Sequence, residues 1–283
     1  MAESRLLTGR RGLVMGVAND HSIAWGIART LAAHGAELAF TYQGEAQLKR
    51  LKPLAASIGS KLVLAGDVEK DDELDAAFAT LKREWGGLDF LVHAIAYSDK
   101  NELKGRYVDT SRENFVRSLS VSCYSFTAVA RRAAQLMAGK GGAMLTLSYL
   151  GASRVMPSYN VMGVAKAALE ASVRYLAADL GHDGIRVNAI SAGPIRTLAG
   201  SAVSDGRTMF KWIRALSPLH RTVELDHIGG AALYLLSELA AGVTGEVHFV
   251  DAGYNVIGVP PASLLKSWNA AGNGDGDKED AET

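Results

Sequence analysis

Short apolar runs alternate with longer amphipathic stretches along this 283-residue chain, and that alternation is the strongest constraint on its fold. The apolar runs are rich in Val, Leu, Ile and Phe, and several are apolar on both faces, which is typical of strands buried in a parallel sheet. Such runs predict strands at residues 12–17, 37–42, 61–66, 88–96, 143–148, 185–191 and 246–250. The stretches between them predict helices at residues 22–34, 71–85, 112–138, 158–180 and 224–239. Because parallel strands need long crossover connections, this order predicts a parallel sheet with helices on both faces.

The alternation continues through residues 1–260, which we expect to form a single Rossmann-type, doubly wound α/β domain with a seven-stranded parallel sheet. Residues 193–218 depart from it, since they carry Gly, Pro and Ser and a short helix-like piece near 207–216. A long insertion at the carboxyl end of a strand is a suitable place for a substrate lid. Residues 261–283 are a C-terminal extension, Gly-rich and acidic from about 269, for which we expect disorder.

Composition narrows the class of protein. The hydrophobic content of 48% and charged content of 21% fit a chain with a substantial core. The net charge is zero, which gives no reason to expect nucleic acid or an anionic membrane as a partner. The chain has no 18-residue apolar run, its N-terminus does not read as a signal peptide, and its single cysteine fits a reducing compartment. We therefore expect a cytoplasmic protein, and we assign no metal site.

The segment from Gly16 to Gly26 has the order strand, loop and helix start that suits a dinucleotide pyrophosphate. The usual Gly-x-Gly-x-x-Gly is absent, but Ser22 and Ile23 would supply backbone donors at the helix start. Asp67-Val68 and the small residues around Ile95 end two further strands, where they would meet a cofactor. Taken singly, each of these signals also fits ordinary turns or sheet packing.

The end of the second predicted strand bears on the choice of cofactor. That position usually carries an acid for the ribose of NAD or an arginine for the phosphate of NADP. Here the strand ends at Gln43, and the next cations, Lys49 and Arg50, lie in the following helix. The lack of an arginine at the strand end favours NADH.

Tyr159 and Lys166 are seven residues apart, which is two turns of a helix, so the phenol and the ammonium would project from one face. A cation beside a phenol favours the phenolate and lowers its pKa, which suits a proton donor working near neutral pH. A further phenol, Tyr149, lies ten residues upstream. A Tyr and a Lys at this spacing also occur on helices by chance, so the spacing alone leaves catalysis open.

Taken together, the segments at 16–26, 40–43, 147–151, 159–167 and 186–199 resemble the bacterial NADH-dependent enoyl-acyl-carrier-protein reductases, a divergent type within the short-chain dehydrogenase superfamily. The resemblance covers roughly residues 7–257. Commoner members of the superfamily carry Tyr-x3-Lys with an upstream catalytic Ser, whereas this chain carries Tyr-x6-Lys with Tyr149. Ala96 stands where the family usually has Gly, and Gly206 where related enzymes often have Phe.

The resemblance implies a homotetramer that reduces the trans-2 C=C bond of enoyl thioesters on acyl-carrier protein, the last step of type II fatty-acid elongation. NADH would give a hydride to the β-carbon, Tyr159 would donate to the enolate oxygen, and Lys166 would bind the nicotinamide ribose. Tyr149 would position the thioester or deliver a proton. The implied cofactor residues are Gly16, Ser22, Ile23, Gln43, Asp67, Val68, Ile95, Lys166, Gly193, Ile195, Thr197, Leu198 and Ala199. The implied substrate residues are Ala96, Tyr97, Ser98, Tyr149, Tyr159 and Met162.

Two other functions fit the same fold. The first is a carbonyl reductase of the 3-ketoacyl type, against which the Tyr-x6-Lys spacing and Tyr149 argue. The second is a non-catalytic NAD-binding paralogue, against which the retained tyrosines and lysine argue.

Overall fold

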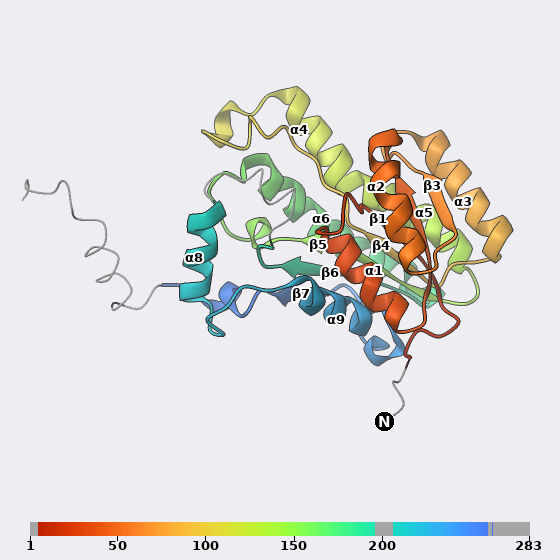
Figure 1. Cartoon of the computed structure of the whole chain (residues 1–283). Coiled ribbons are helices and arrows are strands. Elements are labelled where there is room, and N and C mark those ends of the chain that lie inside the picture. Colours follow the sequence, from red (N-terminus) through yellow and green to blue (C-terminus); the bar gives the residue numbers. More distant parts are fainter. Residues whose placement is uncertain (1–4, 196–205, 260–261, 263–283) are drawn as a thin grey trace, which may run out of the picture.

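The computed structural model describes residues 5–195, 206–259 and 262 of the chain. Its strands form one seven-stranded sheet in the order β3-β2-β1-β4-β5-β6-β7, and every neighbouring pair is parallel. The strands are β1 Arg11–Met15, β2 Glu37–Tyr42, β3 Leu62–Ala65, β4 Phe90–His93, β5 Gly142–Ser148, β6 Ile185–Ala192 and β7 Val247–Val250 (Figure 1). Each predicted strand is confirmed. The fourth ends at His93, three residues early, so Ala94 to Ala96 leave the sheet as a loop.

Helices cover both faces of this sheet (Figure 1). They are α1 Ile23–Ala33, α2 Gly44–Ser57, α3 Asp71–Trp85, α4 Arg112–Leu119, α5 Ser125–Met137, α6 Asn160–Leu180, α8 Gly206–Leu216 and α9 Leu225–Leu236. The sequence explains α3 well, because acids fill its first turn, Lys82 and Arg83 its last, and left-handed Gly86 ends it. The doubly wound α/β architecture is therefore confirmed, and α8 matches the helical piece predicted near 207–216.

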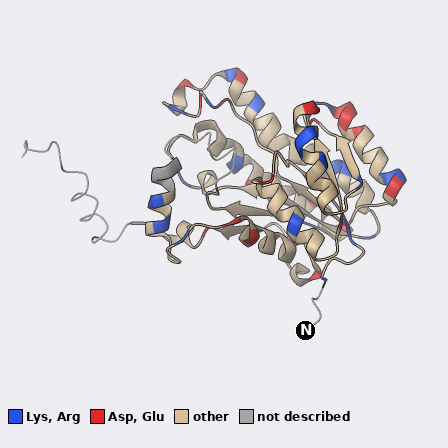
Figure 2. Ribbon diagram, viewed as in Figure 1, with Lys and Arg blue, Asp and Glu red and all other residues tan. Residues whose placement is uncertain are grey.

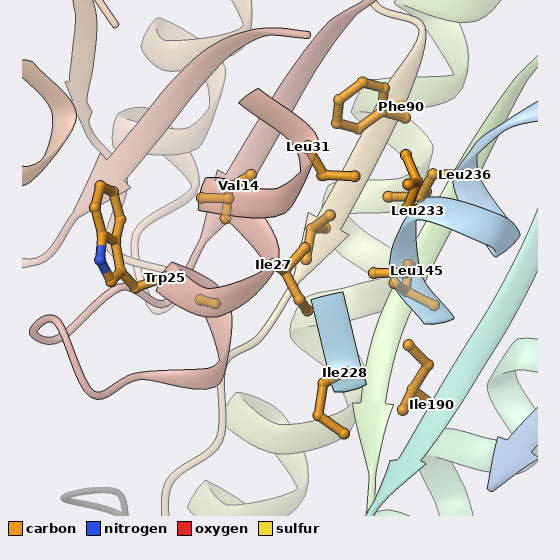
Figure 3. Packing of buried hydrophobic residues seen from close by; sticks show 14 of the residues in the cluster. Val14, Trp25, Ile27, Leu31, Phe90, Leu145, Ile190, Ile228, Leu233 and Leu236 are labelled. Atoms are coloured by element: carbon orange, nitrogen blue, oxygen red, sulfur yellow. The ribbon is translucent and has the colours of Figure 1, made fainter. Parts of the chain in front are cut away.

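The core consists of two apolar layers, one on each face of the sheet. Successive β1 residues alternate between them: Leu13 and Met15 pack with α3, α5 and α6, and Val14 packs with α1, α2 and α9. Figure 3 shows the layer that contains Val14, in which side chains from strands and helices pack together. Those labelled include Val14, Ile27, Leu31, Phe90, Leu145, Ile190, Ile228, Leu233 and Leu236. Each such fully buried side chain stabilises the fold by about 1.5–3 kcal/mol relative to an exposed one.

Gly26 belongs to α1 rather than to the loop before it, and it has a packing role. A Cβ at this position would lie 2.7 Å from the Cβ of Leu225 at the start of α9. The missing side chain lets α1 and α9 approach each other closely.

The helix predicted over 112–138 is not a regular α-helix throughout. A π-helical turn, Ser120–Tyr124, connects α4 directly to α5, so the chain stays helical while its α-helical pattern is interrupted. The wider turn directs the hydroxyls of Ser122 and Ser125 toward the ends of the sheet, where they bond the main chain of Tyr97 and the ring of His93. Such turns occur often at functional sites.

Two predictions fall largely outside the described part of the chain. The proposed lid includes residues 196–205, and the C-terminal extension includes all of 263–283, so both stay predictions. None of the helices in the described segments is long and apolar enough to span a bilayer.

Candidate active site

A cavity of about 750 Å³ opens at the carboxyl ends of the strands. It is lined by residues that follow β1 to β6 and by the start of α6. Every described residue of the predicted site lies on its wall, namely Gly16, Ser22, Ile23, Gln43, Asp67, Val68, Ile95, Ala96, Tyr97, Ser98, Tyr149, Tyr159, Met162, Lys166, Gly193 and Ile195. The remaining three, Thr197, Leu198 and Ala199, lie outside the described residues.

Gly16 directly follows β1 with a φ of +95°, and a Cβ there would lie 2.1 Å from the carbonyl oxygen of Ala94. Only glycine allows the loop after β1 to approach the loop after β4 this closely. The two loops that would meet the cofactor therefore touch through their backbones.

Ser22 occupies the N-cap position of α1, but its side chain makes no capping hydrogen bond to the helix. Its hydroxyl instead accepts hydrogen bonds from the N–H groups of Ala18 and Asn19, both at 3.0 Å. The hydroxyl thus closes the preceding loop, and the first turn of α1 carries no acidic residue. A helix start of this kind presents backbone donors and positive potential to an anion.

Tyr159 and Tyr149 face each other on the wall of the cavity. Their rings meet edge to face, with centroids 5.0 Å apart and planes at 69°. Tyr159 stands at the start of α6, against Gly151, where a Cβ would lie 2.4 Å from the Tyr159 ring. Any side chain at Gly151 would displace that ring.

Lys166 lies two turns further along α6 and is buried, with 6% of its surface exposed. Its Nζ donates to the carbonyl oxygen of Leu147 at 2.7 Å, near the end of β5. This bond fixes the ammonium at the floor of the cavity and leaves hydrogens available for a further acceptor.

Burial decides the pKa values of these groups. It raises the pKa of Tyr149 to about 12 and raises that of Tyr159 well above its usual range, with neighbouring Tyr149 and Glu170 adding to the latter shift. Burial lowers the pKa of Lys166 to about 8. Burial thus moves the pKa of Tyr159 in the direction opposite to the one expected from a neighbouring cation. Both phenols keep their protons at neutral pH and can act as hydrogen-bond donors.

His93, at the end of β4, is fully buried and sits beneath the loop that carries Ile95. Its ring nitrogens contact the hydroxyls of Ser125 at 2.8 Å and Thr146 at 3.2 Å. Burial lowers the pKa of His93 to about 3, so the ring is neutral. His93 is thus a buried core residue whose ring nitrogens both have hydroxyl partners.

The loop of residues 97–106 forms the wall opposite α6. Its start is held by Ser122, whose hydroxyl bonds both the N–H and the carbonyl oxygen of Tyr97 at 2.9 Å. Its far part is held by Asn160, whose Nδ2 donates to the carbonyl oxygens of Glu102 and Gly105 at 3.1 and 3.4 Å. Asn160 has a φ of +31° and directly follows Tyr159, so this anchor joins the wall to the tyrosine.

Arg117 on α4 connects the two halves of the cavity. Its guanidinium lies 4.4 Å from the centre of the Tyr97 ring and donates two bonds of 3.0 Å to the carboxylate of Glu69. Glu69 lies in the turn that Asp67 closes by accepting its N–H at 3.0 Å. The turn after β3 is thereby tied to Tyr97.

Sequence reasoning missed several residues on the cavity wall, among them Gln47, Arg50, Leu103, Arg117, Val121 and Phe210. A signal existed for two of them, since Gln47 and Arg50 stand four and seven residues after Gln43 and so share a helix face with it. Arg50, expected to lie in the helix after the strand end, does so in α2, and that helix brings it to the cavity.

Comparison with known proteins gives consistent results. Residues 16–255 match the family model described as enoyl-(acyl carrier protein) reductase. The chain is 64% identical over 261 residues to enoyl-[acyl-carrier-protein] reductase [NADH] 2 of Rhizobium meliloti, covering 92% of this chain and 97% of that protein. It is 56% identical over 255 residues to the NADH-dependent FabI of Rickettsia typhi, covering 90% and 97%. The crystal structure of the enoyl-(acyl-carrier-protein) reductase of Anaplasma phagocytophilum in complex with NAD is similar, with a TM-score of 0.88, 58% identity and coverage of 90% and 97%.

Proposed function

This chain belongs to the enoyl-(acyl carrier protein) reductase family, and we propose that Tyr159, Tyr149 and Lys166 carry out its reaction. That reaction is the NADH-dependent reduction of the C=C bond of enoyl thioesters on acyl-carrier protein, in fatty-acid synthesis. The observation that supports the assignment of residues most is the edge-to-face pair of buried phenols, which shares one cavity with Lys166 and the loop after β1.

The residues around the cavity fit a dinucleotide. At Gly16 the loop after β1 approaches the loop after β4 closely, and the start of α1, where Ser22 makes no side-chain cap, offers backbone donors for a pyrophosphate. Gln43 and Asp67 lie at the ends of β2 and β3, where the adenosine would be held. Lys166 would bind the nicotinamide ribose, while Gly193 and Ile195 would face the carboxamide. When bound, NADH supplies the hydride that the β-carbon receives.

Tyr159 stabilises the charge that develops on the substrate. As the β-carbon becomes saturated, negative charge moves to the thioester oxygen, and the Tyr159 hydroxyl donates a hydrogen bond to it. The raised pKa keeps the proton on this phenol until the oxygen becomes basic enough to compete for it. Tyr149, which contacts the Tyr159 ring, orients the thioester or passes on a proton.

The two remaining walls would receive the acyl chain and shape its entrance. Ala96, Tyr97 and Ser98 after β4, Met162 of α6 and Phe210 of α8 all line the cavity. These apolar and aromatic groups exclude water from the reacting carbons, which strengthens the hydrogen bond from Tyr159. We expect the chain length that the enzyme accepts to depend on this region.

A substrate comparison tests the reaction. Purified protein is mixed with NADH and either a crotonyl or dodecenoyl thioester or a 3-ketoacyl thioester, and the loss of NADH absorbance is followed. We expect turnover with the enoyl thioesters. Turnover with the keto substrate alone would show a carbonyl reductase instead, and binding of NADH without any turnover would show a non-catalytic paralogue.

We extend the proposal to a homotetramer in the cytoplasm. Charges of both signs are interspersed over the outer helices (Figure 2), yet α4, the π turn and α6 expose Val116 by 60%, Tyr124 by 60% and Tyr175 by 75%. Large exposed apolar groups on neighbouring helices are typical of subunit contacts. Sedimentation equilibrium should give about four times the mass of one 29.9 kDa chain, and a monomer at micromolar concentration would contradict this. The single cysteine, Cys123, suits the reducing cytoplasm.

A further inference from the structure

The side chain of Gln47 bridges the ends of two neighbouring strands. Its Oε1 accepts the backbone N–H of Gln43, just after β2, at 2.6 Å. Its Nε2 donates to the carbonyl oxygen of Val17, just after β1, at 2.8 Å. One half-buried amide, projecting from the first turns of α2, thus satisfies a donor and an acceptor on different loops at the edge of the cavity.

Arg50 adds a further contact from the next turn of α2. Its Nε donates to the carbonyl oxygen of Ala18 at 2.8 Å. The N–H of Ala18 is already bonded to the hydroxyl of Ser22. The peptide groups of residues 17–19 are therefore fixed from two sides, by α2 through their carbonyl oxygens and by Ser22 through their N–H groups.

This region lacks the usual support of a sheet. β1 ends at Met15, so Val17 and Ala18 stand beyond its ladder of hydrogen bonds. A loop without such support must be ordered when a ligand binds, and that ordering weakens the affinity. The amide of Gln47 replaces the missing ladder with side-chain contacts.

We propose that Gln47 is a positioning residue for the dinucleotide, which holds the loop after β1 and the end of β2 together so that the adenosine end of the cavity is formed before the ligand arrives. This rests on the proposed placement of the cofactor along these loops. Gln47 acts on the backbone of Val17 and Gln43, and Arg50 assists it at Ala18. Its contribution is to the affinity for the adenosine half and not to the chemical step.

Two substitutions at Gln47 separate its bonds while keeping a good helix former. Gln47→Glu keeps the acceptor for Gln43 but places a carboxylate oxygen against the carbonyl of Val17. Gln47→Met keeps the length of the side chain and loses both bonds. The matched controls are Gln135→Glu and Gln135→Met, because Gln135 is an exposed residue of α5 on the other face of the sheet.

The measurement is calorimetric titration with NADH and, separately, with ADP-ribose, which lacks the nicotinamide. Because each lost bond is worth a few-fold in affinity, we expect both Gln47 variants to bind both ligands about tenfold more weakly than the wild type. The KM for a crotonyl thioester at saturating NADH and the kcat should change by less than about twofold, and the melting temperature of the free protein should stay close to that of the controls.

Several results would overturn the proposal. An unchanged affinity for NADH in Gln47→Met would show that Gln47 does not position the dinucleotide site. Weaker binding of NADH with unchanged binding of ADP-ribose would place the effect at the nicotinamide end. A melting temperature far below that of the Gln135 variants would show that Gln47 contributes only to the general stability of the fold. Failure of the wild type to reduce enoyl thioesters would contradict the proposed reaction but would leave these binding results to decide the role of Gln47.

Discussion

The two ends of the cavity are built in different ways. The end where the adenosine and pyrophosphate would lie consists mainly of backbone. The side chains of Ser22, Gln47 and Arg50 fix that backbone through hydrogen bonds. At the other end, the phenols of Tyr149 and Tyr159 form the surface themselves. The same cofactor binds in every turnover, so a preformed backbone surface is suited to bind it. The reaction, in contrast, needs side chains with particular pKa values and positions. Changes at the first end should therefore act on affinity, and changes at the second on turnover or on the KM for the thioester.

The two ends also differ in their electrostatics. The first contains the start of α1, the positive end of the helix dipole, with no acid in its first turn. At the second, burial raises the pKa of both phenols, which therefore stay neutral, and lowers that of Lys166 to about 8. Anion binding and charge development during the reaction are thus kept apart along one cavity.

The largest effect that would test this contrast is expected from Tyr159→Phe. Loss of an oxyanion donor typically lowers kcat by about 10²–10³, so we expect turnover of an enoyl thioester to fall by that factor. The dissociation constant for NADH, measured by fluorescence titration, should stay within about twofold. Tyr234→Phe, on the surface of α9, is the matched loss of a hydroxyl and should retain full activity. A fully active Tyr159→Phe enzyme would show that the phenol has no chemical role.

The next effect concerns the backbone end. Gly16→Ala combines a φ of +95° with a Cβ 2.1 Å from a carbonyl oxygen, and we expect it to weaken NADH binding by about 3 kcal/mol, or roughly a hundredfold. Gly59→Ala is the control, since it has a φ of +75° with no atom within 4 Å. Its strain should cost about 1 kcal/mol of stability without affecting NADH. Unaltered NADH affinity in Gly16→Ala would mean that this loop does not hold the cofactor.

A smaller effect follows from the buried ammonium of Lys166. Its pKa is lowered from 10.5 to about 8, so the unfolded chain binds more protons than the folded one between these values, and stability should rise with pH in that window. Lys166→Met removes this contribution. Wild type should therefore gain up to about 2 kcal/mol relative to Lys166→Met between pH 8 and pH 9.5, measured by urea unfolding at one protein concentration. Equal pH slopes for the two proteins would show that the ammonium is not destabilised by burial.

The smallest effect is expected at the support of the substrate wall. Ser122→Ala removes the hydroxyl that bonds the main chain of Tyr97, and loss of such contacts costs about 1 kcal/mol. We expect a rise of about fivefold in the KM for a long-chain enoyl thioester, with NADH affinity unchanged. Ser120→Ala, on the exposed side of the same π turn, should behave as wild type. A selective loss of NADH affinity in Ser122→Ala would break the division between the two ends.

Sequence patterns predicted the parts of the molecule that follow a repeating arrangement of apolar residues. Strands buried on both faces leave unmistakable apolar runs, so all seven were located, and the residues at their carboxyl ends converge on one cavity as parallel topology requires. The departures occur where one side chain serves a local purpose. The hydroxyl of Ser22 closes a loop, a role that its place at a helix start does not reveal, and the periodicity over 112–138 gives no sign of a π turn.

Burial explains the other departures. The spacing of Tyr159 and Lys166 indicated a shared helix face correctly but could not reveal that both groups are removed from water, which reverses the expected pKa shift. Gln47 and Arg50 look like ordinary solvated residues of a surface helix. Their spacing from Gln43 indicates a shared helix face, but their bonds to Val17 and Ala18 depend on where α2 lies relative to the loop after β1.

The π turn at Ser120–Tyr124 also sets the phase of everything that follows it in the helix. A π turn holds one residue more than the regular repeat, and each residue corresponds to about 100° of rotation in an α-helix. If that residue were deleted, α5 would rotate by about this angle, taking Ser125 away from His93 and Phe126 out of its fully buried position. The segment should thus tolerate many changes of side chain on its exposed side. It should tolerate no change of length, because the number of residues here determines which face of α5 points toward the sheet.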